Sequence, residues 1–99
     1  MLKITKKLEE RTLTVEASGR IDTTTAPDFE NEIKDSLASV SELILDFSKV
    51  EYISSAGLRV LLSAQKIMTK QGSMKLTNVS SEIMEIFEVT GFSDILDIE

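Results

Sequence analysis

Cysteine and histidine are both absent from this chain of 99 residues. Without them the chain can form no disulfide, no thiolate nucleophile and no zinc site. A histidine general base is excluded as well, and with it a Ser-His-Asp triad within one chain. We therefore expect no bound metal, no cofactor and no catalytic residue, and a protein that is not an enzyme.

Long apolar runs are also absent. The longest extend over only a few residues, too short to span a bilayer, and residues 1–7 lack the apolar block of a signal peptide. We expect a cytoplasmic protein with no membrane span.

Positive charge is scarce. The chain has 11 Lys and Arg side chains against 17 Asp and Glu, a formal net charge of −6. Because phosphate contacts need clustered Lys and Arg, this balance opposes nucleic-acid binding, and no nucleic acid is expected as a partner. A protein partner with a basic patch fits the charge better. The alternative is that the charge mainly keeps a small protein soluble.

The remaining composition is that of one globular domain. Hydrophobic residues make up 41% and charged residues 28% of the chain, close to the average of soluble domains. The length suffices for one modest core, and no linker rich in Pro, Gly or Ser divides the sequence. We expect a single domain that spans residues 1–99.

The first third of the chain predicts a hairpin and a helix. Apolar and polar residues alternate over residues 2–8 and 13–17, which is typical of two antiparallel strands with one buried face, joined by a turn at Glu9 and Glu10. Gly19 is expected to end the second strand. A helix from about Ala26 to Ala38 follows, since apolar side chains recur there every four positions. We expect Thr25 to be its N-cap.

Two strong elements follow in the middle of the chain. The short, continuously apolar run from Leu43 to Phe47 predicts a central strand that is buried on both faces. A broad apolar stripe from Leu58 onward predicts a second helix that ends near Gly72.

The last third predicts a strand and a helix. Alternation from Met74 to Val79 indicates the strand, and Ser80 or Ser81 caps a third helix that ends at Gly91. A short final strand around residues 95–98 is a weaker expectation. The predicted order is thus β-β-α-β-α-β-α, with parallel, right-handed crossovers and helices that cover the sheet. In such sheets sites form outside the carboxyl ends of the strands, where Ser54, Ser55 and Asp22 are expected.

Nucleotide-loop and hydrolase motifs are not present. The four glycines are too scattered for a dinucleotide-binding or phosphate-binding loop. A nucleophile elbow centred on Ser55 needs glycine at position 53, where this chain has Ile53. A Ser-Lys arrangement with Lys49 or Lys66 stays open, although nothing in the spacing favours it.

Two carboxylates are candidates for a site between strand ends. Asp46 is expected at the end of the central strand and Asp22 at the end of the second, so the two could approach each other. No third carboxylate is placed with them, which makes a weak magnesium site. The favoured interpretation is that Asp46 caps the turn after its strand.

The segment from Ile53 to Gly57 is the most informative one, because it places the hydroxyls of Ser54 and Ser55 where a predicted strand ends and a helix begins. From the residues alone, Ser55 is best interpreted as an N-cap. The same helix end has free N–H groups and a positive dipole, so it also suits a phosphate.

A family resemblance favours a phosphate on Ser55 over a role as N-cap alone. The segment from Asp46 to Leu58 resembles the signature of STAS domains, in particular of bacterial anti-sigma factor antagonists, and the segment from Gly19 to Asp22 resembles a second recurring segment of that family. The resemblance covers nearly the whole chain. It implies one α/β domain, with a four- to five-stranded mixed sheet, an N-terminal hairpin and three or more covering helices.

The resemblance also implies a function. In that family the serine two positions before the glycine is phosphorylated by an anti-sigma factor that is a serine kinase, and a serine phosphatase reverses the step. Here that serine is Ser55, and the family's aspartate after the second strand corresponds to Asp22. The unmodified protein would bind the anti-sigma factor and the phosphorylated one release it, which regulates transcription that depends on a sigma factor.

One departure concerns the residue before the acceptor, which is often aspartate in the family and is Ser54 here, so Ser54 is an alternative acceptor. A non-switching STAS scaffold subunit of a lipid-transport or stress-signalling assembly is the alternative function. The predicted partner-binding residues are Asp22, Thr23, Thr24, Ser54, Ser55, Ala56, Gly57 and Arg59.

Overall fold

The computed structural model describes residues 2–99 and contains the predicted order of elements. The strands and helices are β1 (Lys3–Glu9), β2 (Thr12–Ile21), α1 (Ala26–Lys34), β3 (Glu42–Ile53), α2 (Ser55–Gln71), β4 (Ser73–Thr77) and α3 (Ser81–Thr90), followed by a 3-10 helix, η1 (Phe92–Asp94).

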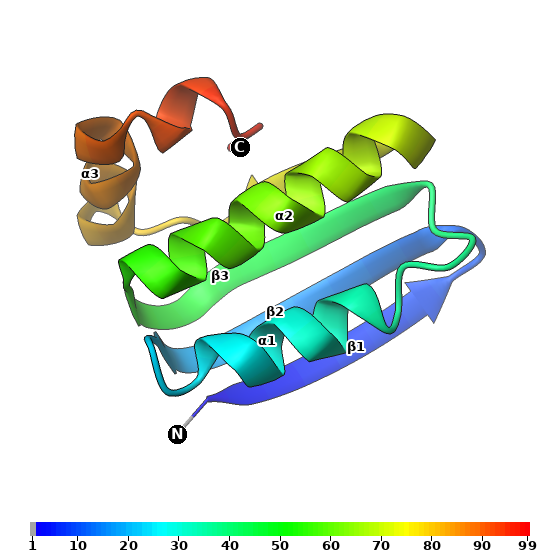
Figure 1. Ribbon diagram of the computed structural model, residues 1–99, viewed down its shortest axis with the longest axis horizontal. Helices are drawn as coiled ribbons and strands as arrows, with labels where there is room; N and C mark the ends of the chain where they lie inside the picture. The colour runs from blue at the N-terminus through cyan, green and yellow to red at the C-terminus, as the bar shows by residue number, and fades with distance from the viewer. Residues whose placement is uncertain (1) are drawn as a thin grey trace.

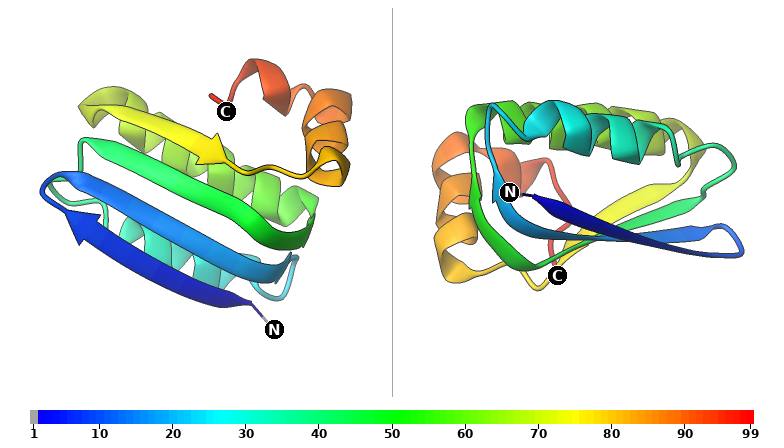
Figure 2. Two further views of the ribbon diagram at one scale, coloured as in Figure 1. Left: turned by 180° about the vertical axis from the view of Figure 1, so that it is seen from behind. Right: turned by 90° about the horizontal axis from the view of Figure 1, so that it is seen from below.

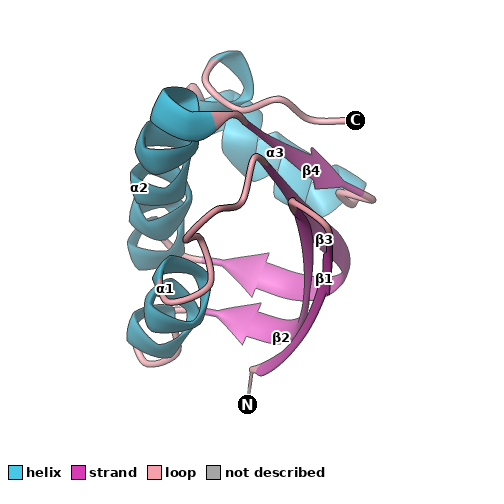
Figure 3. Ribbon diagram, turned by 90° about the vertical axis from the view of Figure 1, so that its right-hand side faces the viewer, coloured by secondary structure: helices cyan, strands magenta, loops and turns pink. Residues whose placement is uncertain are grey.

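The four strands form one mixed sheet in the order β1-β2-β3-β4. β1 and β2 make the antiparallel hairpin that the alternation predicts, while β2, β3 and β4 run parallel. The helices α1 and α2 lie side by side over one face of the sheet (Figure 1), so that the domain has two layers (Figure 3). Seen from behind, the other face is open (Figure 2).

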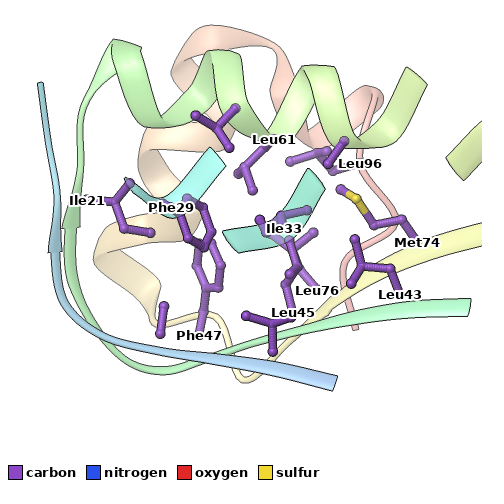
Figure 4. Close-up of a cluster of buried hydrophobic side chains, with 14 of the residues drawn as sticks. Ile21, Phe29, Ile33, Leu43, Leu45, Phe47, Leu61, Met74, Leu76 and Leu96 are labelled. Atoms are coloured by element: carbon purple, nitrogen blue, oxygen red, sulfur yellow. The ribbon is translucent and has the colours of Figure 1, made fainter. Parts of the chain in front are cut away.

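The core fills the space between the sheet and these two helices (Figure 4). Alternate side chains of β2, β3 and β4 point into it, and each large apolar side chain buried there stabilises the fold by about 1.5–3 kcal/mol. A tilted aromatic pair, Phe47 with Phe87 at 6.4 Å between ring centroids, anchors α3 to β3. The largest fully buried side chains are Ile21, Phe29, Ile33, Leu43, Leu45, Phe47, Ile53, Leu61, Met68, Leu76, Ile83 and Phe87.

The prediction that the central strand is buried on both faces is wrong. In β3 the side chains of Leu43, Leu45 and Phe47 are buried, whereas Ile44 and Asp46 between them are half-exposed. The reason is that both long helices lie on the same face, so a strand in the middle of the sheet is still covered on one side.

Several predicted boundaries also move, among them the end of β3, which lies at Ile53 instead of Phe47. β2 continues past Gly19 to Ile21, because the irregular pairing with β3 at Gly19 is absorbed by the positive φ of 116° at this glycine. α1 ends at Lys34 instead of Ala38, since the bonds from Ser36 N to Ile33 O and from Leu37 N to Lys34 O tighten the chain into shorter turns.

The last predicted strand is reduced to one bridge. Residues Phe92–Asp94 are a 3-10 helix, and only Ile98 pairs with Leu76 of β4. The third helix is as expected, with Ser80 as its cap and Gly91 at φ 85° as its end. No helix among residues 2–99 has the length and hydropathy needed to cross a membrane.

We predict that Gly72 is required by a close backbone approach. A Cβ atom added there would lie 1.8 Å from the carbonyl oxygen of Ser41, which is backbone and has no room to move. Gly72→Ala should lower the free energy of unfolding by about 3 kcal/mol in urea denaturation. Gly91→Ala, at a positive φ but in open space, is the control and should cost only about 1 kcal/mol. Equal losses would contradict the prediction.

Candidate functional site

The candidate site forms where β2 and β3 end side by side. Ile21 pairs with Ile53, and the backbone N–H of Ser54 donates to the carbonyl oxygen of Ile21 at 2.8 Å. The loop that begins at Asp22 and the turn that begins at Ser54 are therefore neighbours, as the parallel crossover predicts.

The two serines of this turn have different environments. Ser54 is the N-cap of α2, with φ −94° and ψ 176°, and its Oγ accepts a hydrogen bond from Gly57 N at 3.4 Å. Ser55 is the first helical residue and is exposed, and its hydroxyl has no hydrogen-bond partner within residues 2–99. The prediction that Ser55 is the cap is therefore wrong. The helix end is capped, and a second hydroxyl beside it is free.

Gly57 determines how closely α2 approaches the strand ends. It is buried, and a Cβ atom there would lie 2.6 Å from Ile53 Cγ1 and 2.7 Å from Ile21 Cγ2. The missing side chain allows the first turn of α2 to rest directly on these two residues. Gly57 thus contributes to this edge by positioning the helix, whereas Ser55 and Arg59 are on its surface.

The loop after β2 is held by the carboxylate of Asp22. Its Oδ1 accepts hydrogen bonds from Thr24 N at 3.0 Å and Thr25 N at 3.1 Å. The hydroxyl of Thr25 accepts from Asp22 N at 2.9 Å and donates to the carbonyl oxygen of Arg20 at 2.8 Å. Thr25 is the N-cap residue of α1, as predicted, although its side chain makes no capping hydrogen bond. This network leaves Thr23 and Thr24 exposed at the tip.

These hydrogen bonds also stabilise the ionised form of the Asp22 carboxyl group. The N–H of Thr25 is the main cause that holds the pKa of Asp22 below its usual value of 3.8, with smaller contributions from Thr24 and from Arg20, whose Nε lies 3.8 Å from Asp22 Oδ2. Desolvation opposes this effect in part. Asp22 is therefore a carboxylate at neutral pH and gives this edge a fixed negative charge.

Sequence reasoning missed Arg20 and Tyr52. They are opposite each other in the register of β2 and β3, and the Arg20 guanidinium lies 4.5 Å from the centre of the Tyr52 ring. The pair is exposed beside Asp22. Both lie in the segments that resemble the family, but only the strand register brings them together, so no local pattern in the sequence could have identified the pair.

Two hollows flank the first turn of α2, of about 340 Å³ and 320 Å³, and Arg59 lines both. Within the part of the chain that the structure describes, no carboxylate lies within 4.0 Å of the Arg59 guanidinium. The first hollow is lined by Thr23, Ala26, Pro27, Glu30, Ala56, Arg59 and Val60, and the second by Ser55, Leu58, Arg59, Thr90 and Phe92.

Asp46 does not belong to this site. β3 continues seven residues beyond it to Ile53, so Asp46 lies in mid-strand and does not meet Asp22, contrary to expectation. It instead accepts from Ser48 N at 2.9 Å and Asn78 Nδ2 at 3.2 Å. Burial alone would raise the pKa of Asp46, but these hydrogen bonds outweigh it and lower the pKa. Among residues 2–99 no group of three carboxylates could hold a metal ion.

Comparison with known proteins agrees with this architecture. The STAS domain family matches residues 3–99. The chain belongs to the STAS domain family. A curated relative of this STAS domain is the anti-sigma-B factor antagonist of Bacillus subtilis (strain 168), which is 33% identical over 93 residues, or 93% of this chain and 85% of the relative.

Solved structures share the fold of this STAS domain. An anti-sigma factor antagonist from Mycobacterium paratuberculosis has a TM-score of 0.90 at 23% identity, with 99% of this chain and 85% of that chain covered. SpoIIAA, an anti-sigma factor antagonist, has a TM-score of 0.76 at 15% identity in its unphosphorylated form, with 98% and 87% covered. The phosphorylated form of SpoIIAA from Bacillus has a TM-score of 0.75 at 16% identity, with 98% and 91% covered.

We predict that the two serines differ in their contribution to stability. Ser54→Ala should lower the free energy of unfolding by about 1 kcal/mol, because Gly57 N loses its capping acceptor. Ser55→Ala should change it by less than about 0.5 kcal/mol, since the exposed hydroxyl has no partner to lose. Urea denaturation of both variants is the measurement, and a larger loss for Ser55→Ala would contradict this assignment.

A second prediction concerns pH. Because the folded-state pKa of Asp22 is lowered, its stabilisation is complete above the unfolded pKa, near 3.8, and is lost as pH falls through the lower folded value. The free energies of unfolding of wild type and Asp22→Asn are compared from about pH 7 to about pH 2.5. Their difference should stay constant down to about pH 4 and then shrink. A constant difference over the whole range would contradict this role of Asp22.

Proposed function

We propose that this STAS domain is an anti-sigma factor antagonist whose switch is phosphorylation of Ser55. Its partner would be an anti-sigma factor with serine kinase activity, and binding would release the sigma factor for transcription in the cytoplasm. Two findings support the proposal: the family membership with relatives that carry this name, and the free hydroxyl of Ser55 beside a capped helix end.

The division of roles between the two serines carries the proposal. Ser54 occupies the position before the acceptor, and its hydroxyl oxygen is engaged with Gly57 N. Ser55 is exposed and its hydroxyl is unengaged, so a kinase could reach it without disturbing the cap. The structure thus favours Ser55 over Ser54 as the acceptor, and it accounts for Ser54 as a structural residue.

The unmodified edge would suit close packing of a protein partner. Its exposed or half-exposed side chains are small, as in Thr23, Thr24, Ser55 and Ala56, and a partner surface can approach the backbone there. Arg59 adds a cation that has no carboxylate partner in the described chain and is available to an acidic group of the partner. The domain would act by binding and would perform no catalysis itself.

Phosphorylation would change the energetics of this contact. The kinase transfers the γ-phosphoryl group of ATP to Ser55 Oγ, the hydroxyl proton is lost, and ADP leaves. The product carries about −1.5 to −2 charges at pH 7. The N-terminus of α2 tolerates them, so the domain stays folded. In the interface, however, an unpaired dianion is costly to bury, and Asp22 adds a fixed negative charge beside it.

Reversal would require a serine phosphatase that hydrolyses the phosphate ester. Because Ser55 begins a helix and is exposed, its phosphate would be accessible without unfolding. The two forms would then differ in charge at one edge and share one fold. SpoIIAA, which is known in both forms, has this same fold in each.

The test uses the full chain with ATP and a purified anti-sigma factor of the serine-kinase class from the same organism. Mass spectrometry should locate the phosphate on Ser55 in wild type and in Ser54→Ala, and Ser55→Ala should remain unmodified. Ser55→Ala should bind the kinase as wild type does, whereas Ser55→Asp should bind about tenfold or more weakly. Calorimetry with purified proteins measures both affinities.

Thr69→Asp is the matched control, since it adds the same charge at an exposed position near the other end of α2 and should leave binding unchanged. Phosphate confined to any residue other than Ser55 would contradict the proposed switch. Loss of binding in Ser55→Asp without any phosphate transfer would instead support the scaffold function, in which this edge is a permanent contact.

A further inference from the structure

The two edges of the sheet differ in how they are covered. At β4, Leu76 N donates to Asp97 O and Glu99 N donates to Leu76 O, both at 2.9 Å, so the C-terminal segment covers part of that edge. At the other edge β1 pairs with β2 alone, and in Figure 2 nothing lies along its outer side. An open edge presents unpaired N–H and C=O groups to a further strand.

An apolar side chain and an apolar hollow lie on this same strand. Leu8 is 60% exposed, although it is a large hydrophobic residue in a regular strand. A hollow of about 410 Å³ lies near the start of β1, with Leu2 and Ile4 in its lining beside Thr25 and Asp28. Leu8 and Ile4 are both on the side of β1 that faces α1, because successive side chains alternate between the two faces.

The sequence of β1 is complementary to itself in one antiparallel register. If Lys6 meets Lys6 of a second copy on a twofold axis, Lys3 is opposite Glu9 and Ile4 is opposite Leu8, each pair occurring twice. A shift by two residues would instead place Lys3 opposite Lys7. The first register therefore pairs opposite charges and buries Leu8 against the hollow at Ile4.

Lysine side chains on an edge strand ordinarily hinder its pairing with another strand. In β1, however, two lysines have carboxylate partners within their own chain. Lys6 Nζ lies 2.6 Å from Glu32 of α1, so the central Lys6 pair would be neutralised by two glutamates. Lys7 Nζ lies 3.3 Å from Glu9. A second hollow between β1 and α1 contains Glu32 and Asp35, an acidic lining that attracts the basic β1 strand of another copy.

We propose that β1 binds the β1 strand of a second copy of this chain, so that the two sheets join and Leu8 of each copy fills the hollow at Leu2 and Ile4 of the other. One strand pair is a small interface, so the dimer should form in the micromolar to millimolar range. The proposal does not depend on phosphorylation of Ser55 or on an anti-sigma factor.

Sedimentation velocity of the full chain, from about 10 µM to about 500 µM, tests the proposal. Wild type should shift from monomer to dimer with concentration. Leu8→Lys should weaken the dimer about ten- to hundredfold, because it removes the apolar contact. Val89→Lys makes the same change at an 82% exposed position on α3 and should have no effect.

A charge exchange tests the register. Lys3→Glu and Glu9→Lys should each weaken the dimer, and the double variant should restore it, since the pair then forms with its signs reversed. Circular dichroism confirms that each variant is folded. A chain that stays monomeric at every concentration, a dimer insensitive to Leu8→Lys, or a double variant no better than the single ones would each overturn the proposal.

Discussion

The candidate site depends on the close contact between the first turn of α2 and the paired ends of β2 and β3. Gly57 allows this contact, because any side chain there would collide with Ile21 and Ile53. The same strand pairing lets Ser54 N reach the carbonyl of Ile21 and brings the Asp22 loop beside the turn. A hydroxyl, a fixed carboxylate and a helix end are thereby collected within one small edge, where a change in charge acts on all of them.

Two adjacent serines carry structure and the proposed regulation separately. The hydroxyl of Ser54 satisfies an N–H of α2, and that of Ser55 is free. Were one serine to do both, the oxygen that accepts from Gly57 N would also be the oxygen that carries the phosphate. With the roles divided, a phosphate on Ser55 changes the surface while the cap remains in place. The proposed switch is therefore a switch of binding rather than of folding.

Both long helices cover the same face of the sheet, and this arrangement explains which features of the fold the sequence predicted and which it did not. Alternation and helical spacing identified every helix and strand of the order β-β-α-β-α-β-α, because each element has one buried face whose period is local. They overestimated the burial of β3 and the length of α1, since which face is covered depends on where the other elements pack. The open face and the free β1 edge follow from that same packing, and on them rests the inferred contact between two copies.

By itself the sequence determined the α/β class, the order of elements and the STAS family, and it predicted a small set of site residues around Ser55. These are local properties: residue type, spacing and motif. Only the tertiary structure decided which serine caps the helix, that Asp22 and Thr25 together hold their loop, and that Arg20 meets Tyr52. It also separated Asp46 from Asp22 by extending β3. These outcomes depend on strand register and on the exact end of each element, which are set by contacts between residues far apart in the chain.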